Sequence, residues 1–169
     1  IDGNGIDKQL RSVSPADVQI DKGGYRHFML KEIMEQPQAV ASVLRNRVDF
    51  QEGRIELPEL GFSQQELNDF RKVVLIGCGT SLHASQVGRY LFEQLAGVPA
   101  EAEAASEFRY RDPLIDKNTL VIAIAQSGET ADTVAAMQMV REKEGRLVTI
   151  CNVEGSQSTR LAEGTLYMG

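Results

Sequence analysis

The sequence predicts an α/β domain with a doubly wound, flavodoxin-like sheet of about five parallel strands and helices on both faces, a three-layer αβα arrangement. Two observations predict this fold. Residues 73–76, 120–124 and 147–151 are short, apolar runs, as expected of parallel strands buried on both faces. Stretches of helical length separate these runs, and right-handed crossovers then leave only a few possible strand orders.

The chain after residue 24 begins with a helical pattern. Apolar side chains recur at three- and four-residue steps between Tyr25 and Met34, which builds one apolar face. Pro37 should end this helix and open a second one over residues 39–44, because proline lacks an N–H group but suits a first helical turn. Residues 63–66 are Ser-Gln-Gln-Glu, a capping box that predicts a further short helix.

Strands and helices alternate in the rest of the chain. Helices are expected over about residues 81–96 and 130–144, with Gly145 as the C′ residue of the second. Two weaker strands are expected over residues 100–105 and 165–168. This alternation favours a parallel sheet with helices on both faces.

Residues 1–24 lack the pattern of a core segment. Asn4-Gly5 suits a type I′ hairpin turn, and a polar stretch from Ser12 ends in Gly23-Gly24. We therefore expect residues 1–24 to be the end of an upstream unit plus a linker, and residues 25–169 to form the α/β domain.

The composition is that of an ordinary soluble globular protein of 169 residues, with 42% hydrophobic and 25% charged residues. A formal net charge of −6 offers no basic excess for nucleic acid or an anionic membrane, so local donors must hold any anionic ligand.

Cys78 and Cys151 form neither a disulfide framework nor a zinc pattern. Residues 120–125, the longest apolar run, are too few to span a bilayer, and residues 1–20 show no signal peptide, so we expect a cytoplasmic protein.

Two hydroxyl-rich loops follow the first and third expected strands. Residues 77–81 are Gly-Cys-Gly-Thr-Ser, and residues 126–130 are Gln-Ser-Gly-Glu-Thr. In a sheet of order 2-1-3-4-5 the strand order reverses between these two strands, and ligands of open α/β sheets bind at such a reversal. Each loop leads into a helix whose N-terminus favours an anion, and neither contains Lys or Arg. The sequence therefore predicts a phosphate site built from neutral donors.

Other interpretations of these loops fit less well. A dinucleotide fingerprint requires glycine where Leu82 stands, although Glu101 or Glu103 could serve as the ribose-binding acid. A Walker A loop lacks Gly-Lys-Ser/Thr at the required spacing. The serines and threonines could simply cap the two helices. Two such loops at adjacent strand ends favour a ligand site.

Several reactive side chains carry weaker hypotheses. Cys78, with His83 nearby, could act as a nucleophile, but a single cysteine at a strand end is more often a packed residue. His27 is more often a surface or packing histidine than a base. Glu129 could act as a base, yet its charge beside a phosphate favours an orientation away from it. Residues 107–111 are interpreted as a solvated or interface helix turn.

Five segments together resemble the sugar isomerase (SIS) domain family, and more narrowly the isomerizing aminotransferases that make glucosamine 6-phosphate from fructose 6-phosphate and glutamine. These segments are residues 25–33, 35–37, 77–81, 105–110 and 126–133. In such enzymes a glutaminase domain releases ammonia, and two tandem SIS lobes receive it and isomerise the sugar. The resemblance implies that residues 25–169 are the first SIS lobe, truncated before its C-terminal helices, and that residues 1–24 end the glutaminase domain and form the linker.

The resemblance also implies roles for individual residues. Ser81, Gln126, Ser127 and Thr130 would hold the phosphate, with Thr80 beside the sugar. Ala125 is a departure, because the family often has a serine at this position. One phosphate-binding hydroxyl is therefore missing, which should lower the affinity modestly.

The resemblance places the catalytic glutamate, histidine and lysines in the second lobe and the C-terminal tail, outside this sequence. We therefore expect this chain to bind fructose 6-phosphate or glucosamine 6-phosphate without turnover, and to need no metal or organic cofactor. The implied protein partners are the glutaminase domain, the second SIS lobe and a second copy in a homodimer. The alternative is an SIS module that senses sugar phosphates in a regulator, and a third, weaker hypothesis is a nucleotide-binding domain.

Overall fold

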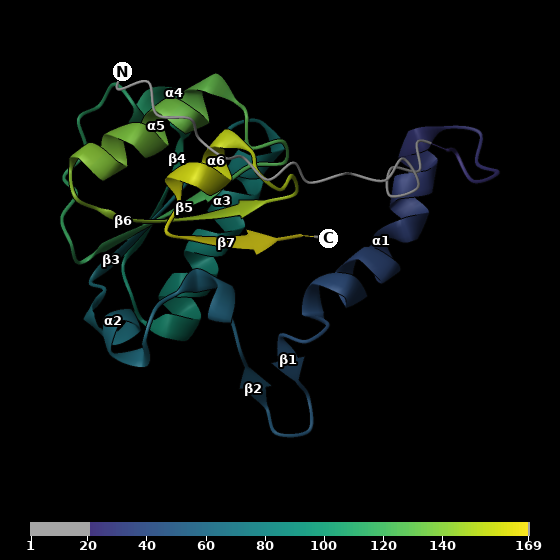
Figure 1. Cartoon of the computed structure of the whole chain (residues 1–169), viewed down its shortest axis with the longest axis horizontal. Coiled ribbons are helices and arrows are strands. Elements are labelled where there is room, and N and C mark those ends of the chain that lie inside the picture. Colours follow the sequence, from purple (N-terminus) through teal and green to yellow (C-terminus); the bar gives the residue numbers. More distant parts are fainter. Residues whose placement is uncertain (1–20, 169) are drawn as a thin grey trace, which may run out of the picture. The chain divides into compact units, whose positions relative to one another are not determined.

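The computed structural model describes residues 21–168 (Figure 1). The hairpin turn expected at Asn4-Gly5 lies outside the described residues. The chain divides into two units, Ile1–Gln38 and Ala39–Gly169. The second unit contains the whole of the predicted sheet.

Helix α1 (Phe28–Leu44) contains Pro37 in its interior. The prediction that Pro37 ends one helix and opens another is therefore wrong. Proline removes a single N–H donor from the helix. Gln38, Ala39 and Ala41 follow it, and their high helix propensity favours continuation of the helix. None of the residues of α1 is buried.

The five-stranded sheet is parallel throughout and has the order β4-β3-β5-β6-β7. In chain order this is 2-1-3-4-5, so the predicted doubly wound arrangement is confirmed. The strands are β3 (Lys72–Gly77), β4 (Ala100–Ala104), β5 (Thr119–Ile124), β6 (Arg146–Cys151) and β7 (Gly164–Tyr167).

Helices cover both faces of this sheet (Figure 1). They are α2 (Gln64–Asp69), α3 (Thr80–Leu91), α4 (Ala105–Phe108), α5 (Ala131–Glu142) and α6 (Gln157–Leu161). A π-helical turn, Phe92–Ala96, continues α3, and a short 3-10 helix, Pro58–Leu60, precedes α2. The predicted capping box of α2 is present, with the hydroxyl of Ser63 accepting a hydrogen bond from the N–H of Glu66.

Successive residues of each central strand point into two separate cores. Val74, Val121 and Leu147 pack with α4 and α5 on one face. Their neighbours Val73, Leu120 and Val148 pack on the other face, where Leu75 contacts Gly88 of α3. The period of two along a strand explains this division, and it accounts for the continuous apolar runs in the sequence.

Two strands of the second unit were not predicted. β1 (Val48–Asp49) and β2 (Arg54–Ile55) form a short antiparallel hairpin. The carboxylate of Asp49 accepts hydrogen bonds from the N–H groups of Gln51 and Glu52, which closes the turn.

α5 (Ala131–Glu142) ends two residues before the predicted end, and the left-handed residue after it differs by one position from the prediction. The left-handed residue is Glu144, with φ of 59°, rather than Gly145. Gly145 is required for a different reason, because a Cβ atom there would lie 2.4 Å from Cγ2 of Ile115. Sequence position indicated the end of the helix, but not which residue reverses the chain.

Across residues 21–168, no helix has the length and apolar character needed to cross a membrane. The same part of the chain has no group of three or more histidine, cysteine, aspartate or glutamate residues that could hold a metal ion.

Candidate functional site

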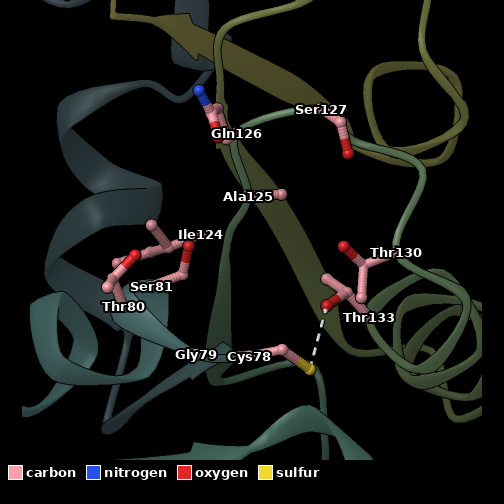
Figure 2. Close-up of a pocket in the computed structure, with 10 residues that line it drawn as sticks. All are labelled: Cys78, Gly79, Thr80, Ser81, Ile124, Ala125, Gln126, Ser127, Thr130 and Thr133. Atoms are coloured by element: carbon pink, nitrogen blue, oxygen red, sulfur yellow. Dashed lines mark hydrogen bonds between the residues drawn. The ribbon is translucent and has the colours of Figure 1, made fainter. Parts of the chain in front are cut away.

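A cavity of about 270 Å³ lies at the carboxyl ends of β3 and β5, the two strands between which the strand order reverses. Figure 2 shows Thr80 and Ser81 on one side and Ser127 and Thr130 on the other. The residues that line it are Cys78, Gly79, Thr80, Ser81, Ile124, Ala125, Gln126, Ser127, Thr130 and Thr133. The structure thus brings together all five predicted binding residues: Thr80, Ser81, Gln126, Ser127 and Thr130.

The first loop owes its shape to two glycines. A Cβ atom on Gly77 would lie 2.9 Å from Cβ of Ser81, so only glycine lets α3 begin this close to the end of β3. Gly79 has φ of 57° and ψ of −128°, a conformation that L side chains rarely adopt. The chain can therefore turn directly from β3 into α3, with Thr80 and Ser81 at the rim of the cavity.

The start of α3 leaves backbone donors near the cavity. The N–H groups of Ser81 and Leu82 donate to the carbonyl oxygens of Cys78 and Gly79 at 3.2 and 3.1 Å. Within residues 21–168, the N–H groups of Gly79 and Thr80 have no hydrogen-bond partner. These groups and the dipole of a 12-residue helix favour an anion here.

The second loop presents its hydroxyls in the same way. The Ser127 hydroxyl oxygen accepts a hydrogen bond of 3.2 Å from the N–H of Glu129, which leaves its own hydrogen available to a ligand. Thr130 precedes α5, but its side chain does not cap that helix. No side chain caps α3 either. Helix capping therefore does not explain why these hydroxyl residues stand at the two helix starts.

The cavity lining is electrically neutral. None of its ten residues is Asp, Glu, Lys, Arg or His. α5, like α3, has 12 residues and begins at the cavity, so two helix N-termini supply the positive potential. An anion held here would be bound by dipoles and hydroxyl groups rather than by a salt bridge.

Ala125 lies at the centre of the lining, between the two hydroxyl-bearing sides (Figure 2). Its side chain is 4% exposed and contributes only a methyl group to the wall. A serine here would add a hydroxyl within the cavity.

Thr133 and Ile124 also line the cavity and were not predicted. The hydroxyl of Thr133 lies 3.7 Å from the sulfur of Cys78, which packs against the core and closes the floor. Thr133 follows Thr130 by three residues on α5, so helical spacing could have indicated it.

The histidines do not join this site. His83 is exposed on α3, where its Nδ1 lies 3.5 Å from the side-chain oxygen of Gln86, and it does not line the cavity. His27 is exposed next to the start of α1. The structure therefore gives Cys78 no histidine partner within the cavity.

Glu129 belongs to the second loop but not to the cavity lining. Its carboxylate accepts hydrogen bonds of 2.8 and 2.5 Å from the backbone and side-chain N–H groups of Gln157. These bonds lower the pKa of the Glu129 carboxyl, the side-chain bond most strongly. The Glu129 carboxylate is therefore hydrogen-bonded outside the cavity, which agrees with the prediction that it points away from the loop's ligand side.

The interpretation of residues 107–111 as a solvated or interface helix turn is wrong for Phe108. Its side chain is 0% exposed and lies in the core with α5. The flanking arginines form ion pairs instead: Arg109 with Asp132 at 2.8 Å, and Arg111 with Glu103. One helical turn is enough to direct Phe108 inward while Arg109 and Arg111 remain at the surface.

Comparison with known proteins agrees with this geometry. Residues 66–169 match the family model described as SIS domain. The chain is 47% identical over 165 residues to a glutamine–fructose-6-phosphate aminotransferase (isomerizing) of Symbiobacterium thermophilum. This match covers 98% of the chain but 27% of the relative, so the chain spans about a quarter of that protein's length.

Two solved structures share the fold. The C-terminal domain of glucosamine-fructose-6-phosphate aminotransferase from Francisella tularensis matches with a TM-score of 0.78 and 34% identity, over 88% of this chain and 42% of that one. The sugar isomerase domain of an RpiR transcription factor from Sphaerobacter thermophilus matches with a TM-score of 0.63, over 82% of this chain and 74% of that one. Its identity of 16% shows a common fold and nothing more. From the family match, supported by the relatives and by the strand order, we conclude that this chain belongs to the SIS domain family.

Proposed function

We propose that this chain is the sugar-phosphate-binding lobe, the first SIS lobe, of an enzyme that makes glucosamine 6-phosphate from fructose 6-phosphate and glutamine. The observation that carries the proposal is the neutral cavity between the starts of α3 and α5, lined by hydroxyl groups from both. The name and identity of the Symbiobacterium relative support the choice of enzyme.

The cavity suits a phosphate monoester. Ser81, Ser127 and Thr130 can donate hydroxyl hydrogens to phosphate oxygens, and Gln126 can add its amide N–H groups. Thr80 would then lie beside the sugar. Because these donors are uncharged, the binding energy comes from several hydrogen bonds and two helix dipoles.

The ten residues that line the cavity include no carboxylate and no histidine. Ketose–aldose isomerisation needs a base, usually a carboxylate or a histidine, and none lines this cavity. We propose that residues outside this chain supply it, in the second SIS lobe and the C-terminal tail. The 169-residue chain should then bind sugar phosphate without converting it.

The remaining organisation follows from the same proposal. Residues 1–24 would be the end of the glutaminase domain and the linker, and residues 25–169 the first SIS lobe. The second lobe would complete the active site, and two copies would pair as a homodimer in the cytoplasm.

Calorimetric titration of the chain with fructose 6-phosphate tests the binding. We expect measurable binding that Ser127→Ala weakens about tenfold, the effect of one hydrogen bond to a charged group. Ser42→Ala is the matched control, since Ser42 is exposed on α1 and does not line the cavity. Absence of binding by the unaltered chain would overturn the proposal, and conversion of fructose 6-phosphate by it would refute the lack of catalysis.

The regulator hypothesis keeps one observation in its favour. A cavity lined only by neutral groups suits a module that senses a sugar phosphate as well as one that helps to transform it. The coding sequence around this segment separates the two. A glutaminase domain upstream supports the enzyme, and a helix-turn-helix domain supports the regulator.

A further inference from the structure

Glu129 forms a bridge between the second loop and a segment 28 residues further along the chain. One carboxylate oxygen accepts the backbone N–H of Gln157 at 2.8 Å, and the other accepts the side-chain N–H of the same residue at 2.5 Å. Gln157 is the first residue of α6. A two-point contact of this kind fixes direction as well as distance.

Two backbone hydrogen bonds also join the loop of residues 126–130 to residues 152–158. The carbonyl oxygen of Gln126 accepts the N–H of Asn152 at 3.1 Å, and that of Gly128 accepts the N–H of Ser158 at 3.0 Å. The three contacts involve residues 126, 128 and 129 of the loop. The intervening Ser127 and the following Thr130 present their hydroxyls to the cavity (Figure 2).

Close packing of Ser156 and Ser158 against Gly128 restricts the conformation of the loop. Ser156 and Ser158 are buried, and their hydroxyls lie 3.2 Å apart. A Cβ atom on Gly128 would come within 2.2 Å of the Ser156 hydroxyl oxygen and 2.4 Å of that of Ser158. The Gly128 contact is therefore buried, whereas the side-chain contact made by Glu129 is the exposed one.

We infer that Glu129 is a positioning residue of the phosphate site: its carboxylate ties the 126–130 loop to the start of α6 and so holds Ser127 and Thr130 toward the cavity. The inference rests on the proposed sugar-phosphate site. Glu129 does not line the cavity, so it acts through its neighbours rather than by contact with the ligand.

A purely electrostatic role for Glu129 makes the opposite prediction. A carboxylate near a phosphate repels it, so its removal would strengthen sugar-phosphate binding if charge were all that mattered. A positioning role predicts weaker binding, because the hydroxyl donors would spend less time in the binding arrangement. The sign of the change therefore separates the two roles.

The test compares Glu129→Ala, Glu129→Gln and the control Glu142→Ala in the complete 169-residue chain. Glu142 is an exposed carboxylate at the far end of α5, so its removal changes the net charge equally without touching the loop. Calorimetry with fructose 6-phosphate should give about fivefold weaker binding for Glu129→Ala, the effect of about one net hydrogen bond. Glu129→Gln should bind nearly as well as the parent, because its amide can still accept the backbone N–H of Gln157.

Hydrogen exchange provides a second readout that needs no ligand. Loss of the Glu129 bridge should speed exchange at the backbone N–H of Ser158, which donates to Gly128, while the control leaves it unchanged. If the parent chain does not bind fructose 6-phosphate, the proposed function fails, and the exchange rate alone decides whether Glu129 holds the loop. Unchanged exchange at Ser158, or binding by Glu129→Ala that equals or exceeds that of the parent, would overturn the inference.

Discussion

A backbone hydrogen bond joins Gly128 to Ser158, and the Ser158 hydroxyl occupies space that a side chain at position 128 would need. The carbonyl oxygen of Gly128 accepts the N–H of Ser158 at 3.0 Å, and a Cβ on Gly128 would lie 2.4 Å from the Ser158 hydroxyl oxygen. The loop of residues 126–130 is thus packed against the start of α6. A side chain at position 128 has no room, whatever its chemistry.

Gly128→Ala should destabilise the chain by more than Gly53→Ala. Both glycines have positive φ, 68° and 63°, so both substitutions carry the cost of a left-handed backbone, about 1–2 kcal/mol. Only Gly128 adds an overlap, since nothing lies within 4 Å of a Cβ on Gly53. We expect an additional loss of about 1–3 kcal/mol, measured by chemical denaturation. Equal losses for the two variants would show that the buried serines move aside without cost.

Ala125→Ser should tighten sugar-phosphate binding. The new hydroxyl would lie within the cavity, and one net hydrogen bond is worth about 1 kcal/mol, or about fivefold in affinity. Ala135→Ser is the control, because Ala135 is half-buried on α5 and does not line the cavity. Titration with fructose 6-phosphate measures both variants. Weaker binding by Ala125→Ser would mean that the methyl group is needed to shape the wall.

The sheet and the location of the cavity could be predicted because the central strands are apolar on both faces. Residues 73–76 and 120–124 are apolar at every position, as expected of strands buried on both faces, and they lie in β3 and β5. Because the strand order was predicted to reverse between these two strands, the loops of residues 77–81 and 126–130 were expected to meet at the carboxyl edge of the sheet. All five predicted binding residues line the cavity found there.

Apart from Pro37, which lies in a helix with no buried residues, the errors came from features that depend on packing between distant residues. Pro37 lies inside α1, although local preference favours a break there. Gly145 is needed because Ile115 lies against it, and Phe108 is buried because α5 covers it. The contact of Glu129 with Gln157 links residues 28 positions apart, and no local pattern indicates it.

Phe108→Ala should destabilise the chain by about 3–5 kcal/mol, the usual cost of removing a buried aromatic ring. Its side chain is 0% exposed, and the cavity left behind would lie within the core between the sheet and α5. Tyr110→Ala provides the comparison, since Tyr110 is 76% exposed two residues away and should cost little. Thermal and chemical unfolding measure both. A small effect for Phe108→Ala would mean that the core collapses into the space.

The stabilising effect of Glu66 should fade in acid. Its carboxylate accepts bonds from the backbone N–H and the hydroxyl of Ser63 and lies 3.3 Å from the Arg146 guanidinium. The backbone bond from Ser63 is the main cause of its lowered pKa. A carboxyl with a lowered pKa in the folded state stabilises the fold above its unfolded value of about 4.5 and loses this effect as the pH falls through the folded value.

The measurement is the difference in unfolding free energy between the parent chain and Glu66→Gln from pH 7 down to pH 3. The parent should be the more stable at neutral pH, and the difference should shrink below about pH 4.5, because protonation makes the glutamate resemble the neutral amide. Glu142→Gln, at an exposed carboxylate on α5, controls for the general change in charge. A difference that stays constant across this range would show that the charge of Glu66 contributes nothing to stability, because protonation of its carboxylate would then leave the stability unchanged.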